Sequence, residues 1–374
     1  MPVFSLPSPC GIGTLGKEAR DFVDFLAAAG QSCWQVLPLG PTGFGDSPYQ
    51  AFSSFAGNPY FIDLDTLAER GLLKPEEYRN RNWGDNPERV DYAALYSNRF
   101  SVLRLACSRL GPGDRAKLAR ALRKADWLED YALFMALKGR FGGVSWLEWP
   151  EELRLRRPAA MEAARKELAE ELEFWRRAQY LFFSQWWDLK RYAHGKGVSI
   201  IGDLPIYAAL DSADVWASPE QFLLDESGFP MEVAGCPPDG FSADGQLWGN
   251  PLFDWPRMKE DGYAWWLRRI SFQFQLYDTL RMDHFRGFDA YYAIPCGDTT
   301  ARGGRWRPGP GAGFFRAVNR ALGKKDIIAE DLGFLTPSVR KLQREAGYPG
   351  MKVLEFAFDS RDTGGVYLPH GYPA

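Results

Sequence analysis

The chain has 374 residues, 45% of them hydrophobic and 25% charged, and a formal net charge of −3. This length fits one large domain, and the charge gives no electrostatic reason to expect a nucleic acid or an anionic membrane as partner. No apolar run approaches a membrane span, and five scattered cysteines without metal-ligand spacing predict a reduced, cytoplasmic protein without a disulfide framework or metal site.

Short apolar runs that end in turn or polar residues predict buried strands, which lie at 32–40, 198–208, 279–288, 326–334 and 351–358. Each of the last four runs follows a helix-like stretch, such as 179–195 or 336–346. Buried strands that alternate with helices are typical of parallel βα units. This many units favour an α/β fold of the (β/α)8 TIM-barrel type, with residues 1–374 as a single catalytic domain.

Two segments interrupt the pattern. Residues from about 65 to 178 are rich in Leu, Ala, Arg and Glu with mixed charge signs, which predicts a mainly helical insertion beside the cleft. Helices that bind a partner protein are the alternative. Residues 211–256 hold so much Gly, Pro, Asp and Asn that we expect no continuous helix or strand there. Their Trp and Phe content disfavours disorder and predicts an active-site loop region.

Aromatic residues make up 15% of the chain and include 14 Trp. A large core explains many of them, since aromatic side chains dominate core burial. Several nevertheless lie in loop-like stretches, such as "DSPYQAFSSFAGNPY" and "GQLWGNPLFDW". Exposed aromatic faces suit the apolar faces of sugar rings, so this pattern favours a carbohydrate ligand.

The stretch "TLRMDHFRGFD" brings a charged pair to the end of a predicted strand. Strand alternation places Arg281 and Asp283 on one face and their apolar neighbours on the other. An arginine beside Asp283 should depress its pKa and keep it ionised, as a nucleophile requires. The alternative is a structural ion pair, but barrel enzymes place their sites at the C-terminal ends of strands. We therefore favour a catalytic role.

A second acidic pair, Glu330 and Asp331, ends the next predicted strand in "DIIAEDLG". Strand periodicity does not decide which of the two points inward. One of them beside Asp283 would form the two-carboxylate arrangement of glycosidases, in which a separation of roughly 5–5.5 Å gives retention of configuration.

Two further residues lie near these carboxylates in the sequence pattern. Asp203 ends the strand in "IIGDLPIY", where contact with a substrate and capping of a loop are equally open roles. His284 adjoins the proposed nucleophile and either binds a sugar hydroxyl or simply packs.

The quoted stretches, together with "WQVLPLGPTGFGDSPYQ", "GCPPDGFSADGQLWGNP" and "IIAEDLGFLTPSVRKL", resemble signature segments of amylomaltases, the 4-α-glucanotransferase family. The resemblance runs through nearly the whole chain in the family's order. It implies a (β/α)8 barrel with helical insertions, no cofactor, and maltooligosaccharides, starch or glycogen-type α-glucans as substrates.

The resemblance also implies residue roles. Asp283 would be the nucleophile, Glu330 the general acid/base and Arg281 the group that orients the nucleophile. The donor sugar would contact Asp203 and His284, while aromatic platforms and further substrate contacts would come from Tyr49, Trp248 and Asn250, with the loop around 235–250 closing over the acceptor.

Two departures from the family pattern bear on these expectations. A third catalytic carboxylate belongs to a later "HDN"-type motif, beyond "YLPHGYPA", and the first strand is cut short, so we expect an incomplete barrel truncated at both ends. Glu355 and Asp359 are candidates for a substitute carboxylate, although core or loop roles fit them better. The alternatives to a transferase are an α-glucan hydrolase on the same barrel and an inactive, truncated glucan-binding protein.

Overall fold

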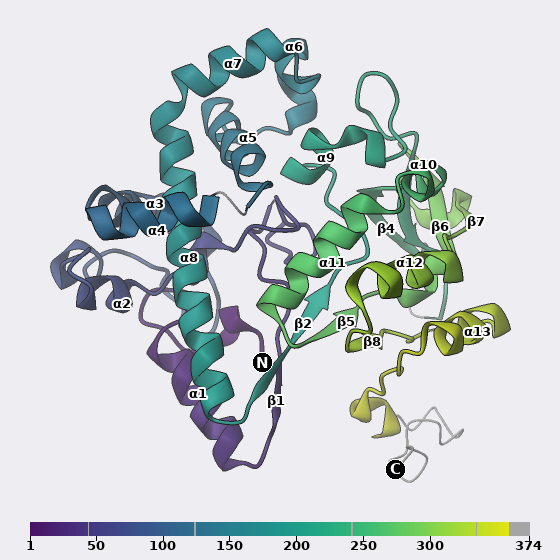
Figure 1. Cartoon of the computed structure of the whole chain (residues 1–374), viewed down its shortest axis with the longest axis horizontal. Helices are drawn as coiled ribbons and strands as arrows, with labels where there is room; N and C mark the ends of the chain where they lie inside the picture. The colour runs from purple at the N-terminus through teal and green to yellow at the C-terminus, as the bar shows by residue number, and fades with distance from the viewer. Residues whose placement is uncertain (44, 123–124, 241, 334, 359–374) are drawn as a thin grey trace.

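The computed structural model describes residues 1–43, 45–122, 125–240, 242–333 and 335–358 (Figure 1). Asp359 lies outside these residues. The α-helices are α1 (Lys17–Ala28), α2 (Leu64–Glu69), α3 (Tyr92–Ser108), α4 (Pro112–Leu122), α5 (Leu128–Arg140), α6 (Glu151–Arg154), α7 (Pro158–Glu167), α8 (Ala169–Gly195), α9 (Ala213–Ala217), α10 (Trp255–Glu260), α11 (Ala264–Leu276), α12 (Ala312–Leu322) and α13 (Pro337–Ala346).

The centre of the molecule is a parallel sheet of four strands in the order β1-β2-β5-β8. The strands are β1 (Cys33–Gln35), β2 (Ser199–Leu204), β5 (Thr279–Met282) and β8 (Ile327–Ala329). Helices α1, α8, α11 and α12 each precede one of them along the chain. All neighbouring strands run parallel, so their C-terminal ends meet at one edge. This confirms an α/β fold with a parallel sheet, while the described residues do not show a closed barrel.

Four of the five predicted strands contain these elements, and the fifth prediction is wrong. Residues 354–358 form the 3-10 helix η8 (Leu354–Phe358) instead of a strand. The local pattern of "MKVLEFAF" fits a buried strand, but in the described residues no neighbouring strand pairs with it.

Buried apolar side chains hold the parallel sheet in the core. Ile200 on β2 and Leu280 and Met282 on β5 are fully buried.

A second, antiparallel sheet was not expected from the sequence. Its strands are β3 (Glu232–Cys236), β4 (Gln246–Pro251), β6 (Ala290–Pro295) and β7 (Arg305–Pro308), in the order β4-β3-β6-β7. The expectation that 211–256 holds no helix or strand is therefore wrong. Gly235 lies so close to Gln246 of the facing strand that a Cβ would collide with its carbonyl oxygen, and the register shifts between Val233 and Gly235. Glycine here permits the close pairing and does not mark a loop.

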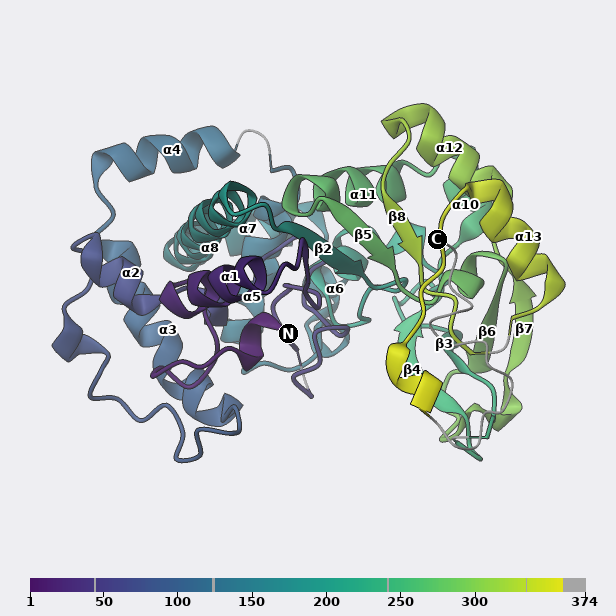
Figure 2. The same ribbon diagram turned by 90° about the horizontal axis from the view of Figure 1, so that it is seen from below.

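The stretch between β1 and β2 contains helices α2 to α8. The longest, α8, turns one face inward, and buried residues such as Leu172, Trp175, Phe182 and Trp186 recur at helical spacing. Figure 2 shows most of these helices, among them α3, α4 and α8, on one side of the parallel sheet and the antiparallel sheet on the other. Among the residues that the structure describes, none of the helices combines the length and the hydrophobicity of a membrane span.

Candidate active site

Acidic and basic side chains gather at the C-terminal edge of the parallel sheet. Asp203 and Arg281 are register partners on β2 and β5. One guanidinium nitrogen, Nη1 of Arg281, donates to Oδ1 of Asp203 at 2.6 Å and to Oδ1 of Asp283 at 3.1 Å. Arg281 therefore bridges the carboxylate of Asp203 on β2 and that of Asp283, which directly follows β5. The contact between Arg281 and Asp283 agrees with the predicted side-chain alternation.

The structure decides which acid after β8 belongs to this cluster. Glu330 accepts hydrogen bonds from the backbone N–H of His284 and of Leu332, both at 2.9 Å. Asp331 points to another segment and accepts from the backbone N–H of Met351 at 2.9 Å. Glu330 is thus the carboxylate held beside the end of β5, next to Asp283.

The pKa of Asp283 is raised to about 7, contrary to the expectation that its arginine keeps it ionised. Burial is the main cause, the charges of Asp203 and Glu330 add to it, and Arg281 opposes it. Arg281 lies nearer Asp203, whose carboxylate offsets part of its charge. The pKa of Glu330 is also raised by burial, with its two backbone hydrogen bonds opposing. The cluster therefore retains a proton near neutral pH.

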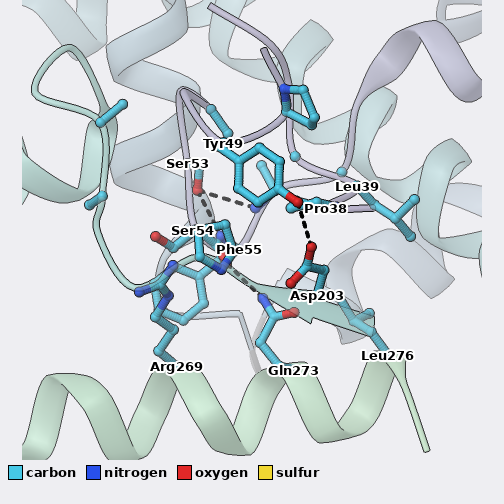
Figure 3. Close-up of a pocket in the computed structure, with 18 of the residues that line it drawn as sticks. Pro38, Leu39, Tyr49, Ser53, Ser54, Phe55, Asp203, Arg269, Gln273 and Leu276 are labelled. Atoms are coloured by element: carbon cyan, nitrogen blue, oxygen red, sulfur yellow. Dashed lines mark hydrogen bonds between the residues drawn. The ribbon is translucent and has the colours of Figure 1, made fainter. Parts of the chain in front are cut away.

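Tyr49 fixes the buried end of the cluster. Its hydroxyl donates to Oδ2 of Asp203 at 2.7 Å, and only 1% of the Asp203 side chain is exposed (Figure 3). A cavity of about 40 Å³ borders both residues and is also lined by Arg269 and Gln273 of α11. Because Asp203 is bound on both carboxylate oxygens and buried, it serves as a rigid anchor for Arg281 and Tyr49.

An open cleft of about 470 Å³ is lined by Tyr49, Asp283 and the β4 residues Trp248 and Asn250. Asn250 is buried, and its amide donates to the carbonyl of Ala208 at 2.9 Å. Asn250 thus lies at the cleft, where the sequence predicted a substrate contact. Its side-chain amide, however, joins β4 to the segment that follows β2.

Gln50 is a cleft residue that the sequence reasoning did not single out. Its amide nitrogen donates to the carbonyl of Trp248 at 3.1 Å and to Oδ1 of Asn250 at 2.9 Å. The signal was present in "DSPYQ", where Gln50 directly follows Tyr49. Tyr207, which also lines the cleft, packs its ring against that of Trp248, and the two ring centroids are 6.2 Å apart. These contacts hold Trp248 in place.

His284 occupies an unusual backbone position, with φ of 45°. Its ring stands edge-on to Trp248, with centroids 4.9 Å apart. Burial lowers its pKa to about 4, so the ring is neutral at pH 7. Nε2 is buried and has no hydrogen-bond partner among the described residues. A neutral imidazole with a spare nitrogen suits a hydroxyl group.

The other candidates do not join this cluster. Glu355 is exposed in η8. The described residues contain no group of three or more His, Cys, Asp or Glu side chains arranged to hold a metal ion. Thus Tyr49, Asp203, Arg281 and Asp283 form one connected group, with Glu330 joined to the backbone of His284.

Comparisons with known proteins agree on one family. The profile of the 4-α-glucanotransferase family, glycoside hydrolase 77, matches residues 1–374. The 4-α-glucanotransferase of Clostridium butyricum is 47% identical over 374 residues, which cover 100% of this chain and 77% of that protein. That of Thermus thermophilus is 51% identical over 375 residues, covering 99% of this chain and 74% of that protein.

A solved structure gives the same result. The amylomaltase of Streptococcus agalactiae, determined in complex with acarbose, matches with a TM-score of 0.97 at 42% identity. The match covers 100% of this chain and 76% of that one. By sequence and by structure, the chain belongs to the 4-α-glucanotransferase family.

Proposed function

We propose that this protein is a 4-α-glucanotransferase that moves α-1,4-glucan segments between maltooligosaccharides by a retaining double displacement. The observation that carries the proposal is the group of Asp203, Arg281, Asp283 and Glu330 at one edge of the parallel sheet, beside a cleft with aromatic walls. Two carboxylates flanking a sugar linkage are the usual groups for breaking and forming glycosidic bonds, and retention requires one of them to act as the nucleophile.

In the first step, Asp283 attacks the anomeric carbon of the donor sugar while protonated Glu330 donates its proton to the departing glycosidic oxygen. The C–O bond to the leaving sugar breaks as the covalent bond to Asp283 forms. The raised pKa of Glu330 suits this acid role. Asp283 must be ionised, so the reactive form carries the shared proton on Glu330, and Arg281 supports the negative charge on Asp283.

In the second step, ionised Glu330 takes the proton of an acceptor 4-hydroxyl, and that oxygen displaces Asp283 from the anomeric carbon. This restores both carboxylates and forms a new α-1,4 link. Transfer exceeds hydrolysis when water is kept from the intermediate until the acceptor binds. We assign this task to the segment around 235–250, which contains the end of β3 and most of β4 with Trp248.

The sugar contacts follow from the cleft. His284 offers a neutral ring nitrogen to a donor hydroxyl, and Tyr49 and Trp248 offer aromatic surface. Asp203 and Asn250 act on the sugar through the groups that they hold. Starch or glycogen-type glucans are the longer substrates that we propose.

The five free cysteines support a reducing, cytoplasmic setting for the protein.

The test is incubation of the chain with maltotriose, followed by chromatography of the products. Glucose together with maltooligosaccharides longer than maltotriose is the expected result, and Asp283→Asn should abolish both. Asp326→Asn is the matched control, because it removes an exposed carboxylate just before β8, at the opposite edge of the same sheet. Glucose and maltose without longer products would show a hydrolase instead, and acarbose binding without turnover would show a binding protein.

A further inference from the structure

Asp331, the acid that follows Glu330, holds the chain segment after α13 against β8. Its Oδ1 accepts from the backbone N–H of Met351 at 2.9 Å, and its Oδ2 accepts from the side-chain amide of Gln343 at 3.3 Å. A Cβ on Gly350 would collide with this carboxylate. The backbone N–H of Ala329 donates to the carbonyl of Pro349 at 2.8 Å. Three successive residues, 349–351, are thus fixed beside the end of β8.

The segment held by Asp331 contacts Arg281 at a different guanidinium nitrogen from the one that binds the carboxylates. Nε of Arg281 donates to the sulfur of Met351 at 3.4 Å, while Nη1 binds Asp203 and Asp283. The guanidinium is planar and rigid, so contacts at Nε and Nη1 together fix its plane. A thioether is a weak acceptor, so Met351 adds orientation more than energy.

We propose that Asp331 is a positioning residue for the nucleophile, acting through Met351 and Arg281 on Asp283. The inference rests on the proposed function, in which Asp283 attacks the sugar. The bond from Arg281 to Asp283 is 3.1 Å, against 2.6 Å to Asp203. Without the contact between Nε and Met351, the guanidinium can rotate. Its longer hydrogen bond, to Asp283, would then break before its shorter one, to Asp203. The nucleophile then loses both its orientation and the nearby positive charge.

Four variants test this chain of contacts: Asp331→Ala, Asp331→Asn, Met351→Leu and the double variant with Ala at 331 and Leu at 351. Glu345→Gln on α13 is the control, because it removes a charge from an exposed pair with Lys341. For each protein, kcat and KM for maltotriose and the pH profile of kcat/KM are measured. Circular dichroism confirms that each variant is folded.

Asp331→Ala should lower kcat on the order of 10- to 100-fold, as misplacement of a reacting group does, with little change in KM. Weaker contact with Arg281 should also move the acidic limb of the pH profile to higher pH, because Arg281 lowers the pKa of Asp283. Asp331→Asn keeps an oxygen for the Met351 N–H and should restore most of the rate. Met351→Leu should reproduce part of the defect, and the double variant should be no worse than Asp331→Ala.

Several results would overturn the proposal. Additive losses in the double variant would mean that Asp331 and Met351 act independently. A fall in kcat with an unmoved pH profile and no rescue by Asn would mark a merely structural role. If Asp283→Asn abolishes transfer but Asp331→Ala does not reduce it, only the positioning role fails. A folded, unmutated chain without transfer products refutes the proposed function itself, and the positioning role with it.

Discussion

The hydroxyl of Tyr49 donates a hydrogen bond of 2.7 Å to Asp203, which is 154 positions away in the sequence and buried on β2. Burial raises the pKa of Asp203, and Arg281 and Tyr49 oppose that rise. A buried carboxylate depends on such donors, because an ionised group without partners is costly to bury. The loop that carries Tyr49 therefore helps to keep the carboxylate of Asp203 ionised at the edge of the sheet.

Tyr49→Phe should destabilise the fold by about 1–3 kcal/mol, since it leaves one buried carboxylate oxygen of Asp203 without its donor. The free energy of unfolding in urea is the measurement. Tyr192→Phe is the matched control, because Tyr192 also donates to an aspartate, Asp24, whose side chain is 45% exposed. Water replaces the lost donor there, so its effect should be smaller. Equal losses in the two variants would contradict the role of burial.

Stability should fall with rising pH because of the carboxylate cluster. The pKa of Asp283 is about 7 in the fold against an ordinary value of 3.8. Between these values the folded state holds a proton that the unfolded chain has released, so the free energy of unfolding decreases as pH rises. This contribution is complete below 3.8 and lost above about 7.

The variant Asp283→Asn should lack this part of the slope. The comparison is urea unfolding of both proteins at about pH 4 and about pH 7.5. The free energy of unfolding of the variant, relative to that of the parent, should be higher at the higher pH. Asp326→Asn should keep the parental slope. A parent whose stability rises through this window more steeply than that of Asp283→Asn would show that Asp283 is ionised in the fold.

His284 should remain neutral throughout the physiological pH range. Burial lowers its pKa to about 4, and the charge of Arg286 adds a smaller effect in the same direction. The chain has three histidines, so nuclear magnetic resonance of the imidazole nitrogens resolves them, and His284→Gln assigns the signal. Its shifts should stay constant above about pH 5.5. Titration near 6.5 would mean that the ring is hydrated rather than buried against Trp248.

Asn250→Ala should weaken both the fold and substrate binding. The substitution removes the bonds to Gln50 and to the carbonyl of Ala208 inside a buried site, which costs about 1–3 kcal/mol. It also frees β4, which carries Trp248, so KM for maltotriose should rise. Asn98→Ala is the control, since Asn98 likewise donates to backbone carbonyls but lies on a more exposed face of α3. An unchanged KM would mean that the bonds of Asn250 do not position Trp248 for substrate binding.

The parallel part of the fold was predictable because its strands are short, apolar and preceded by helices. Alternation along β5 placed Arg281 and Asp283 on one face, and the structure joins them. Periodicity did not separate Glu330 from Asp331, because adjacent residues at a strand end have no fixed side. Their partners decide it, namely the backbone of His284 for one and of Met351 for the other.

The antiparallel sheet and the charge state of the cluster were not predictable in the same way. Strands β3 and β4 contain Gly, Pro and Asn, residues that also build loops. Only the pairing of β4 with β3 and of β3 with β6 distinguishes strands from loops here. The pKa of Asp283 depends on burial and on Asp203, which lies on another strand. Sequence spacing carries no information on how far a carboxylate is removed from water.

The amide of Gln50 has a consequence for redesign of the cleft. It binds both the backbone of Trp248 and the side chain of Asn250, so a loop near the start of the chain and a strand 200 positions later share one joint. If only the β3–β4 hairpin were taken from a relative, it would be separated from the residue that it pairs with in that relative. Both segments therefore need to be exchanged together. Chimeras of this protein should therefore be cut outside the two segments, and never between them.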